Sequence, residues 1–187
     1  ERALSHASAQ PEQQGIRGGL LVARASVARF TGDLERCVAD STSALAVLGE
    51  TSPMFRSIAV LNSAFAFLVG GDVRAESEQR VRLALTLTER AGNLAANMNA
   101  LVTLSLLQTL QGRRRMAGET LATVMQRLED QQAGLLSGAA AGYLAYAEWL
   151  REHNRLAEAE QYLAAGWELM SASLVDAHIL GMAVMTQ

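Results

Sequence analysis

The chain has 187 residues, of which 33 are alanine and 28 are leucine, whereas proline occurs only twice. Alanine and leucine favour helices and proline breaks them, so this composition predicts an all-α protein and excludes a β-sandwich or a β-rich barrel. The formal net charge of -3 gives no electrostatic indication of nucleic-acid binding. The single cysteine, Cys37, excludes an internal disulfide and fits a reducing compartment or a buried position.

Targeting and membrane-spanning segments are not evident in the sequence. Residues 1–6 contain no apolar signal core, and the longest uncharged run, 91–112, is rich in Asn, Gln, Thr and Ser. We therefore expect a cytoplasmic protein. Because the chain starts without Met and stops while an apolar helical pattern continues, we also expect a fragment of a longer chain.

Helix-breaking turns recur along the chain at intervals of about forty residues. Their centres are Gly32, Gly71, Gly112 and Asn154, with spacings of 39, 41 and 42 residues. Glycine and asparagine tolerate the left-handed backbone that ends a helix, and Asp33 and Asp72 are predicted N-caps of the helices that follow. Each turn is therefore expected to join two antiparallel helices.

The segments between the turns alternate in polarity, which predicts pairs of helices. The first helices of the pairs, which are more apolar, are expected at 18–30, 55–69, 94–110 and 135–150, and the second at 34–48, 73–91, 114–128 and 156–170. Residues 1–187 then form a single domain with repeats at about 14–50, 53–92, 93–132 and 133–173, and a partial fifth unit at 174–187.

Repeated helix pairs cannot bury their apolar faces alone, so they must stack. We predict an all-α, right-handed α-solenoid of about four and a half helix hairpins like those of tetratricopeptide repeats (TPR). The more apolar first helices are expected on the inner side. A closed up-down bundle is the alternative, although it does not require repeats in register.

Three segments carry a family resemblance: 101–113, 154–160 and the inter-repeat stretch 84–93. They resemble the TPR-like region of MalT-type, LuxR-family ATP-dependent transcriptional regulators. The resemblance implies an array that senses an effector or a partner protein, between a nucleotide-binding module and a helix-turn-helix. ATP and DNA would be bound by domains outside this stretch, which has no lysine and hence no P-loop. The run Arg113-Arg114-Arg115 departs from the family pattern.

Candidate catalytic and metal-binding groups are sparse. The three histidines lack metal-ligand spacing, Cys37 is expected in the core, and the serines lack a nucleophile context. We therefore expect no enzyme activity, no metal and no cofactor. The arginine run fits either solvated surface or an anion contact. The aromatic residues of the fourth repeat fit either core packing or a docking surface.

A solenoid binds ligands on its concave face, and the turns set the register of that face. Positions thirteen, ten, six and three residues before each turn form one stripe, with an apolar floor between polar ends. Many of these side chains are alternatively expected to pack against neighbouring helices. The candidate groove residues are Ser26, Arg29, Phe65, Asn99, Thr109, Glu148 and Arg151.

Two arginines of this stripe, Arg29 and Arg151, suit a carboxylate or a phosphate on the ligand. Alternatively, Glu148 and Arg151 merely pair along one helix. We expect an effector-sensing or protein-interaction domain of a bacterial LuxR-family regulator. Its groove would bind a small-molecule effector or a regulatory protein, and self-association is a further option. One alternative is a stand-alone TPR-like scaffold. The other is an all-α enzyme, but the sequence contains no group of catalytic residues that supports it.

Overall fold

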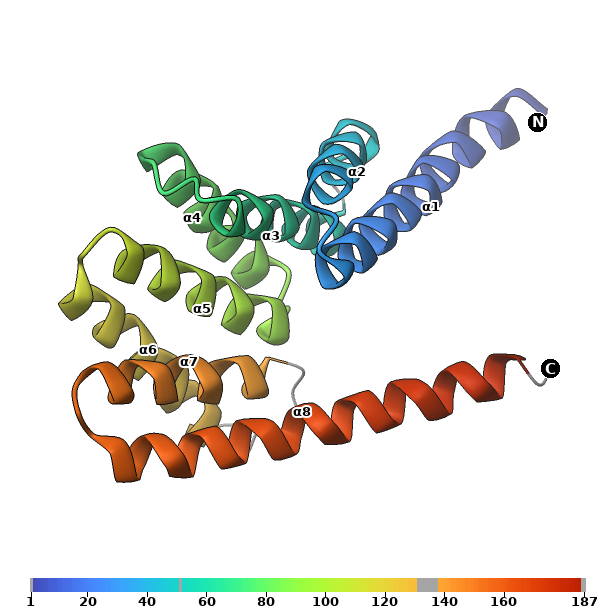
Figure 1. Cartoon of the computed structure of the whole chain (residues 1–187). Coiled ribbons are helices and arrows are strands. Elements are labelled where there is room, and N and C mark those ends of the chain that lie inside the picture. Colours follow the sequence, from blue (N-terminus) through green and yellow to red (C-terminus); the bar gives the residue numbers. More distant parts are fainter. Residues whose placement is uncertain (1, 51, 131–137, 186–187) are drawn as a thin grey trace.

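The computed structural model of the chain describes residues 2–50, 52–130 and 138–185, with side chains described between residues 13 and 171. Within these ranges the chain is helical and contains no strand. Four antiparallel helix pairs follow one another from the blue α1 to the red α8 (Figure 1). The helices are α1 (Arg2–Thr31), α2 (Leu34–Val47), α3 (Pro53–Val69), α4 (Ala75–Arg90), α5 (Leu94–Leu110), α6 (Arg114–Asp130), α7 (Ala139–Glu152) and α8 (Leu156–Met185).

The four predicted turns lie where the sequence places them. Gly32, Gly71 and Gly112 have φ angles of 79°, 84° and 75°, and Asn154 has a φ of 58°. After each turn residue, the next backbone N–H donates to a carbonyl five residues earlier, as Asp33 does to Ala28 at 2.9 Å. This closure satisfies carbonyls that the helix end leaves free, so a residue that tolerates the left-handed region stands at each turn.

The two predicted N-caps behave differently. Asp33 caps α2, because its Oδ1 accepts a hydrogen bond from the backbone N–H of Arg36 at 3.1 Å. The prediction for Asp72 is wrong. Its carboxylate instead accepts hydrogen bonds from the backbone and guanidinium of Arg74, and α4 begins only at Ala75. Asn93 caps α5, with its Oδ1 3.1 Å from the backbone N of Ala96.

The helix pairs stack as an all-α solenoid, as predicted. The first helices α1, α3, α5 and α7 each approach the next in the row closely, whereas the described backbones of α2, α4, α6 and α8 do not approach one another closely. The first helices are therefore crowded together and the second helices are spread, which places the first helices on the inner side. In the described chain α1 does not contact α7 or α8, so the closed bundle is excluded.

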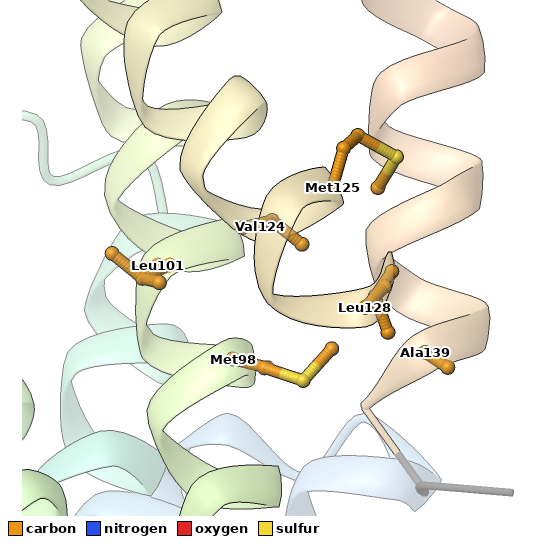
Figure 2. Close-up of a cluster of buried hydrophobic side chains, with 6 residues drawn as sticks. All are labelled: Met98, Leu101, Val124, Met125, Leu128 and Ala139. Carbon is orange, nitrogen blue, oxygen red and sulfur yellow. The ribbon is translucent and has the colours of Figure 1, made fainter. Parts of the chain in front are cut away.

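Buried apolar clusters lie where one pair meets the next. In Figure 2, Met98 and Leu101 of α5 lie near Val124, Met125 and Leu128 of α6 and Ala139 of α7. A smaller cluster joins Cys37 of α2 to Ala28 of α1 and Ala66 of α3. Cys37 is fully buried, as expected, with its Sγ 3.5 Å from the carbonyl oxygen of Asn62.

Several predicted boundaries differ from the structure. Helix α1 begins at Arg2 rather than near residue 18, and α8 continues to Met185, so no turn precedes the expected fifth unit at 174–187. The expected boundary between the third and fourth repeats, at residues 132 and 133, lies outside the described residues, as do residues 135–137 of the expected fourth first helix. None of the described helices is both long and apolar enough to cross a membrane.

Candidate functional site

Three of the predicted groove residues lie together where α1 meets α3. The Nδ2 of Asn62 donates a hydrogen bond to Ser26 Oγ at 2.9 Å. The Arg29 guanidinium lies 5.1 Å from the ring centroid of Phe65 and 4.9 Å from that of Phe30. A cation over two aromatic rings gains electrostatic attraction from their electron-rich faces. Ser26, Arg29 and Phe65 therefore lie together at the interface between α1 and α3.

Arg29 is a half-buried cation without a carboxylate partner. None of the ion pairs in the described part of the chain includes it, and its buried Nε has no hydrogen-bond partner there. Burial lowers the pKa of Arg29, because its charged form loses hydration. An anionic group that reached this position would supply the missing acceptor.

Two further predicted residues, Asn99 and Thr109, bond to their own helix. Asn99 Nδ2 donates to the carbonyl of Ala95 at 3.0 Å, and Thr109 Oγ1 donates to that of Ser105 at 3.0 Å. Both side chains are half-buried on α5. Neither contacts the group around Arg29 through a hydrogen bond in the described chain.

The last two predicted residues, Glu148 and Arg151, form an exposed bidentate ion pair on α7. Arg151 Nε and Nη2 lie 2.8 Å and 2.5 Å from the carboxylate oxygens of Glu148. The hydrogen bond from Arg151 lowers the pKa of Glu148. This pair borders a groove of about 280 Å³ between α7 and α8, lined also by Leu144, Ala147, Leu156, Ala159, Glu160 and Leu163. The seven predicted residues therefore do not form one site.

The predicted stripe is rotated relative to the open face. Val22, Leu61 and Leu68, ten or three residues before their turns, are buried. Leu61 packs with Ala96 and Ala100 of α5, and Leu68 with Leu104 and Leu107. These positions therefore pack one first helix against the next, which is the alternative that the sequence left open.

The open face carries apolar side chains two residues before the turns, a position outside the predicted stripe, and six residues before them, a position within it. We call these residues the inner row. Their exposed fractions are 79% for Phe30, 53% for Val69, 55% for Leu110 and 43% for Leu106, and Phe65 is half-buried. Sequence reasoning missed Phe30, Val69 and Leu110, although their common position two residues before each glycine was a usable signal. A row of exposed apolar groups on stacked helices is typical of a binding surface.

Of the three arginines at 113–115, one forms an ion pair with another repeat and two lie on the exposed surface of α6. Arg113 reaches Glu78 of the preceding repeat and lowers the pKa of that carboxyl through a hydrogen bond. Arg115 pairs with Glu119 at 2.8 Å on the surface of α6. Arg114 is exposed and has no ion-pair partner among the described residues. Of the three arginines, Arg113 therefore links two repeats. Elsewhere in the described part of the chain, no three His, Cys, Asp or Glu side chains come together in a way that could hold a metal ion.

The tyrosines of the fourth repeat pack against one another and against the buried cluster formed by α5, α6 and α7. Tyr146 stands edge-on to Tyr162 with centroids 4.9 Å apart and is stacked on Trp149 at 5.8 Å. A Cβ at Gly118 of α6 would lie 2.7 Å from Trp149 Cζ2, so this glycine lets the indole approach the helix. Trp167 differs, with 62% of its surface exposed.

A family model described as the MalT-like TPR region matches residues 18–186, which covers all four helix pairs in whole or in part. No curated protein matches the chain.

Proposed function

Because the chain belongs to the MalT-like TPR family, we propose that it is the effector-sensing or partner-sensing domain of a bacterial LuxR-family transcriptional regulator. ATP and DNA would be bound by other domains of that regulator, and this domain would carry out no catalysis and hold no cofactor or metal. The domain would work in the cytoplasm, where such a regulator meets DNA.

The observation that carries the proposal is the inner row beside Arg29. Apolar side chains exposed at equivalent positions of three repeats form a floor that a ligand can cover, and hydrophobic burial supplies affinity without fixing orientation. The guanidinium of Arg29, which has no carboxylate partner among the described residues, would fix the orientation of a bound ligand by attracting its anionic group. The ligand class that fits is an apolar molecule or peptide segment with a carboxylate or phosphate directed at Arg29.

A pair of fluorescent probes tests the site in the isolated chain. 8-Anilinonaphthalene-1-sulfonate combines apolar rings with an anion, and N-phenyl-1-naphthylamine has similar rings without the charge. The double variant Leu106→Ser/Leu110→Ser should weaken both probes about thirtyfold, which corresponds to about 2 kcal/mol of lost apolar contact. Arg29→Gln should weaken only the sulfonate.

The matched control is Leu83→Ser, because Leu83 is 50% exposed but lies on the second helix α4. It should bind both probes as the wild type does. Equal binding of the probes by the wild type and the double variant would contradict the proposed site. In the full-length regulator, the double variant should lose the transcriptional response to effector and Leu83→Ser should keep it. If the double variant and Leu83→Ser both kept the transcriptional response, the effector-sensing role would be refuted and a scaffold role would be favoured.

A further inference from the structure

The first helices of the four repeats share one register, so their residues can be compared position by position. The residue seven places before each turn is small and buried in all four, namely Ala25, Ala64, Ser105 and Ala147. The residue two places before each turn is exposed in all four. Val69 and Leu110 are 53% and 55% exposed although α3 and α5 have a first helix on both sides. Neighbouring repeats therefore leave this position open.

The chemistry of this open surface changes between the third repeat and the fourth, which consists of α7 and α8. The positions six and two residues before the turn hold Phe65 and Val69 in the second repeat, Leu106 and Leu110 in the third, and Glu148 and Glu152 in the fourth. Arg151 pairs with Glu148, and Glu152 has no ion-pair partner among the described residues. The inner face of α7 therefore carries one carboxylate in excess.

The first repeat carries the opposite charge beside the same surface. Arg29 lies three residues before its turn, where the second repeat has Leu68, which is 3% exposed and packs against α5. Because a leucine serves the packing at this position, the fold does not require a cation there. The Arg29 guanidinium lies near the rings of Phe30 and Phe65, and no described carboxylate pairs with it. The inner row therefore lies between a cation on α1 and a carboxylate on α7.

Three steps between neighbouring first helices separate these two charges. Packed helices lie about 8 to 10 Å apart, so three steps amount to about 24 to 30 Å. An extended peptide advances about 3.3 Å per residue and covers this distance with about seven to nine residues. A metabolite the size of an amino acid reaches only one of the charges. A segment of a partner protein can present an acidic, several apolar and a basic side chain along one line.

We propose that the inner row binds an extended segment of a partner protein, with an acidic side chain at Arg29, apolar side chains along the row and a basic side chain at Glu152. This rests on the function proposed above and narrows its ligand to a peptide with opposite charges at its two ends. Complementary charges select among partners more than they raise affinity, so the two charges fix the orientation of the segment.

Isothermal titration calorimetry with synthetic nine-residue peptides tests this assignment. All peptides have capped termini and a core of seven alternating leucines and serines. One type has aspartate at one end and arginine at the other, made in both orders, and two control types have aspartate or arginine at both ends. The better order of the first type should bind the wild type about fivefold more tightly than either control. The preference should shrink in about 0.5 M NaCl, because salt screens exposed charges.

Three variants assign the preference to the two charges. Glu152→Arg should make the peptide with two aspartates the best ligand. Arg29→Gln should remove the discrimination against two arginines but keep that against two aspartates. The matched control is Glu129→Arg, which makes the same change of net charge at an exposed position of α6 and should keep the wild-type preference. Circular dichroism checks that each variant keeps its helical fold.

Equal binding of all peptides by the wild type, or no binding at about 1 mM, would overturn the proposal. The uncharged probe N-phenyl-1-naphthylamine then decides whether the proposed function fails with it. If the wild type binds the probe and Leu106→Ser/Leu110→Ser does not, the apolar site stands and its ligand is not a peptide with two opposite charges. If the wild type does not bind the probe either, the inner row is not a binding site and both proposals fail.

Discussion

Gly142 of α7 allows α7 and α6 to approach closely, and this contact predicts the sign of a substitution. A Cβ at position 142 would lie 2.8 Å from Val124 Cγ1 and 3.4 Å from Leu128 Cδ1. Val124 is 0% exposed, and a β-branched side chain in a helix has one strongly preferred rotamer, so the methyl group cannot turn away cheaply. Gly142→Ala therefore forces a shift in the core.

Two opposing effects set the magnitude. Alanine in place of a helical glycine gains about 1 kcal/mol of helix propensity. Overpacking a filled core costs about 1 to 3 kcal/mol. We expect Gly142→Ala to lower the free energy of unfolding by about 1 kcal/mol, which lowers the melting temperature by about 2 to 4 °C for a chain of this size. Urea denaturation and calorimetry measure both quantities.

Two further variants isolate the cause. A Cβ added at Gly15 of α1 would have no heavy atom within 4 Å, so Gly15→Ala should raise stability by up to about 1 kcal/mol. In a Val124→Ala background the clashing methyl group is absent, and Gly142→Ala should no longer destabilise. If Gly142→Ala alone proved as stable as the wild type, the inferred close approach of α6 and α7 would be refuted.

Three other substitutions test single features of the fold. Gly112→Ala should cost about 1 to 2 kcal/mol in urea denaturation because φ is 75° there, and Gly112→Asn should cost less; equal costs would contradict the turn. The pKa of Glu78 is lowered chiefly by Arg113, so its ionised form adds stability above the unfolded pKa of about 4.3 that is lost as the pH falls through the folded value. Glu78→Gln should therefore cost about 1 to 2 kcal/mol at pH 7 and progressively less in acid melts, whereas a pH-independent cost would exclude the ion pair as the cause. Asn62→Ala and Ser26→Ala should show a coupling of about 0.5 to 1.5 kcal/mol in a double-mutant cycle of thermal melts, and additive effects would show that their hydrogen bond contributes nothing.

The repeat architecture could be predicted because local chemistry determines it. Gly32, Gly112 and Asn154 stand where the backbone must be left-handed, and few other residue types accept that conformation. The prediction for Asp72 fails because Arg74, two residues later, binds its carboxylate and moves the start of α4. The local sequence could not show whether the Asp72 carboxylate would cap the following helix or bind Arg74.

The candidate site was harder to predict because it depends on how one repeat is rotated on the next. Leu68 and Val69 are adjacent in sequence, yet one is buried against α5 and the other is half exposed. Helical periodicity separates them by about 100° around α3, and the position of the neighbouring helix decides which of the two is covered. The continuous α8 has a simpler reason, since residues 171–173 contain neither glycine nor proline to end the helix.

The contact pattern of the solenoid has a consequence for how the chain folds. In the described chain, each helix touches only helices one or two places away in the sequence. Few long loops must therefore close before native contacts form, which favours rapid folding. The cooperativity that joins distant parts of a globular domain is replaced by coupling between neighbours. Under denaturant or mechanical load, the outer pairs should open before the central ones, and hydrogen exchange should be slowest in α3 to α6.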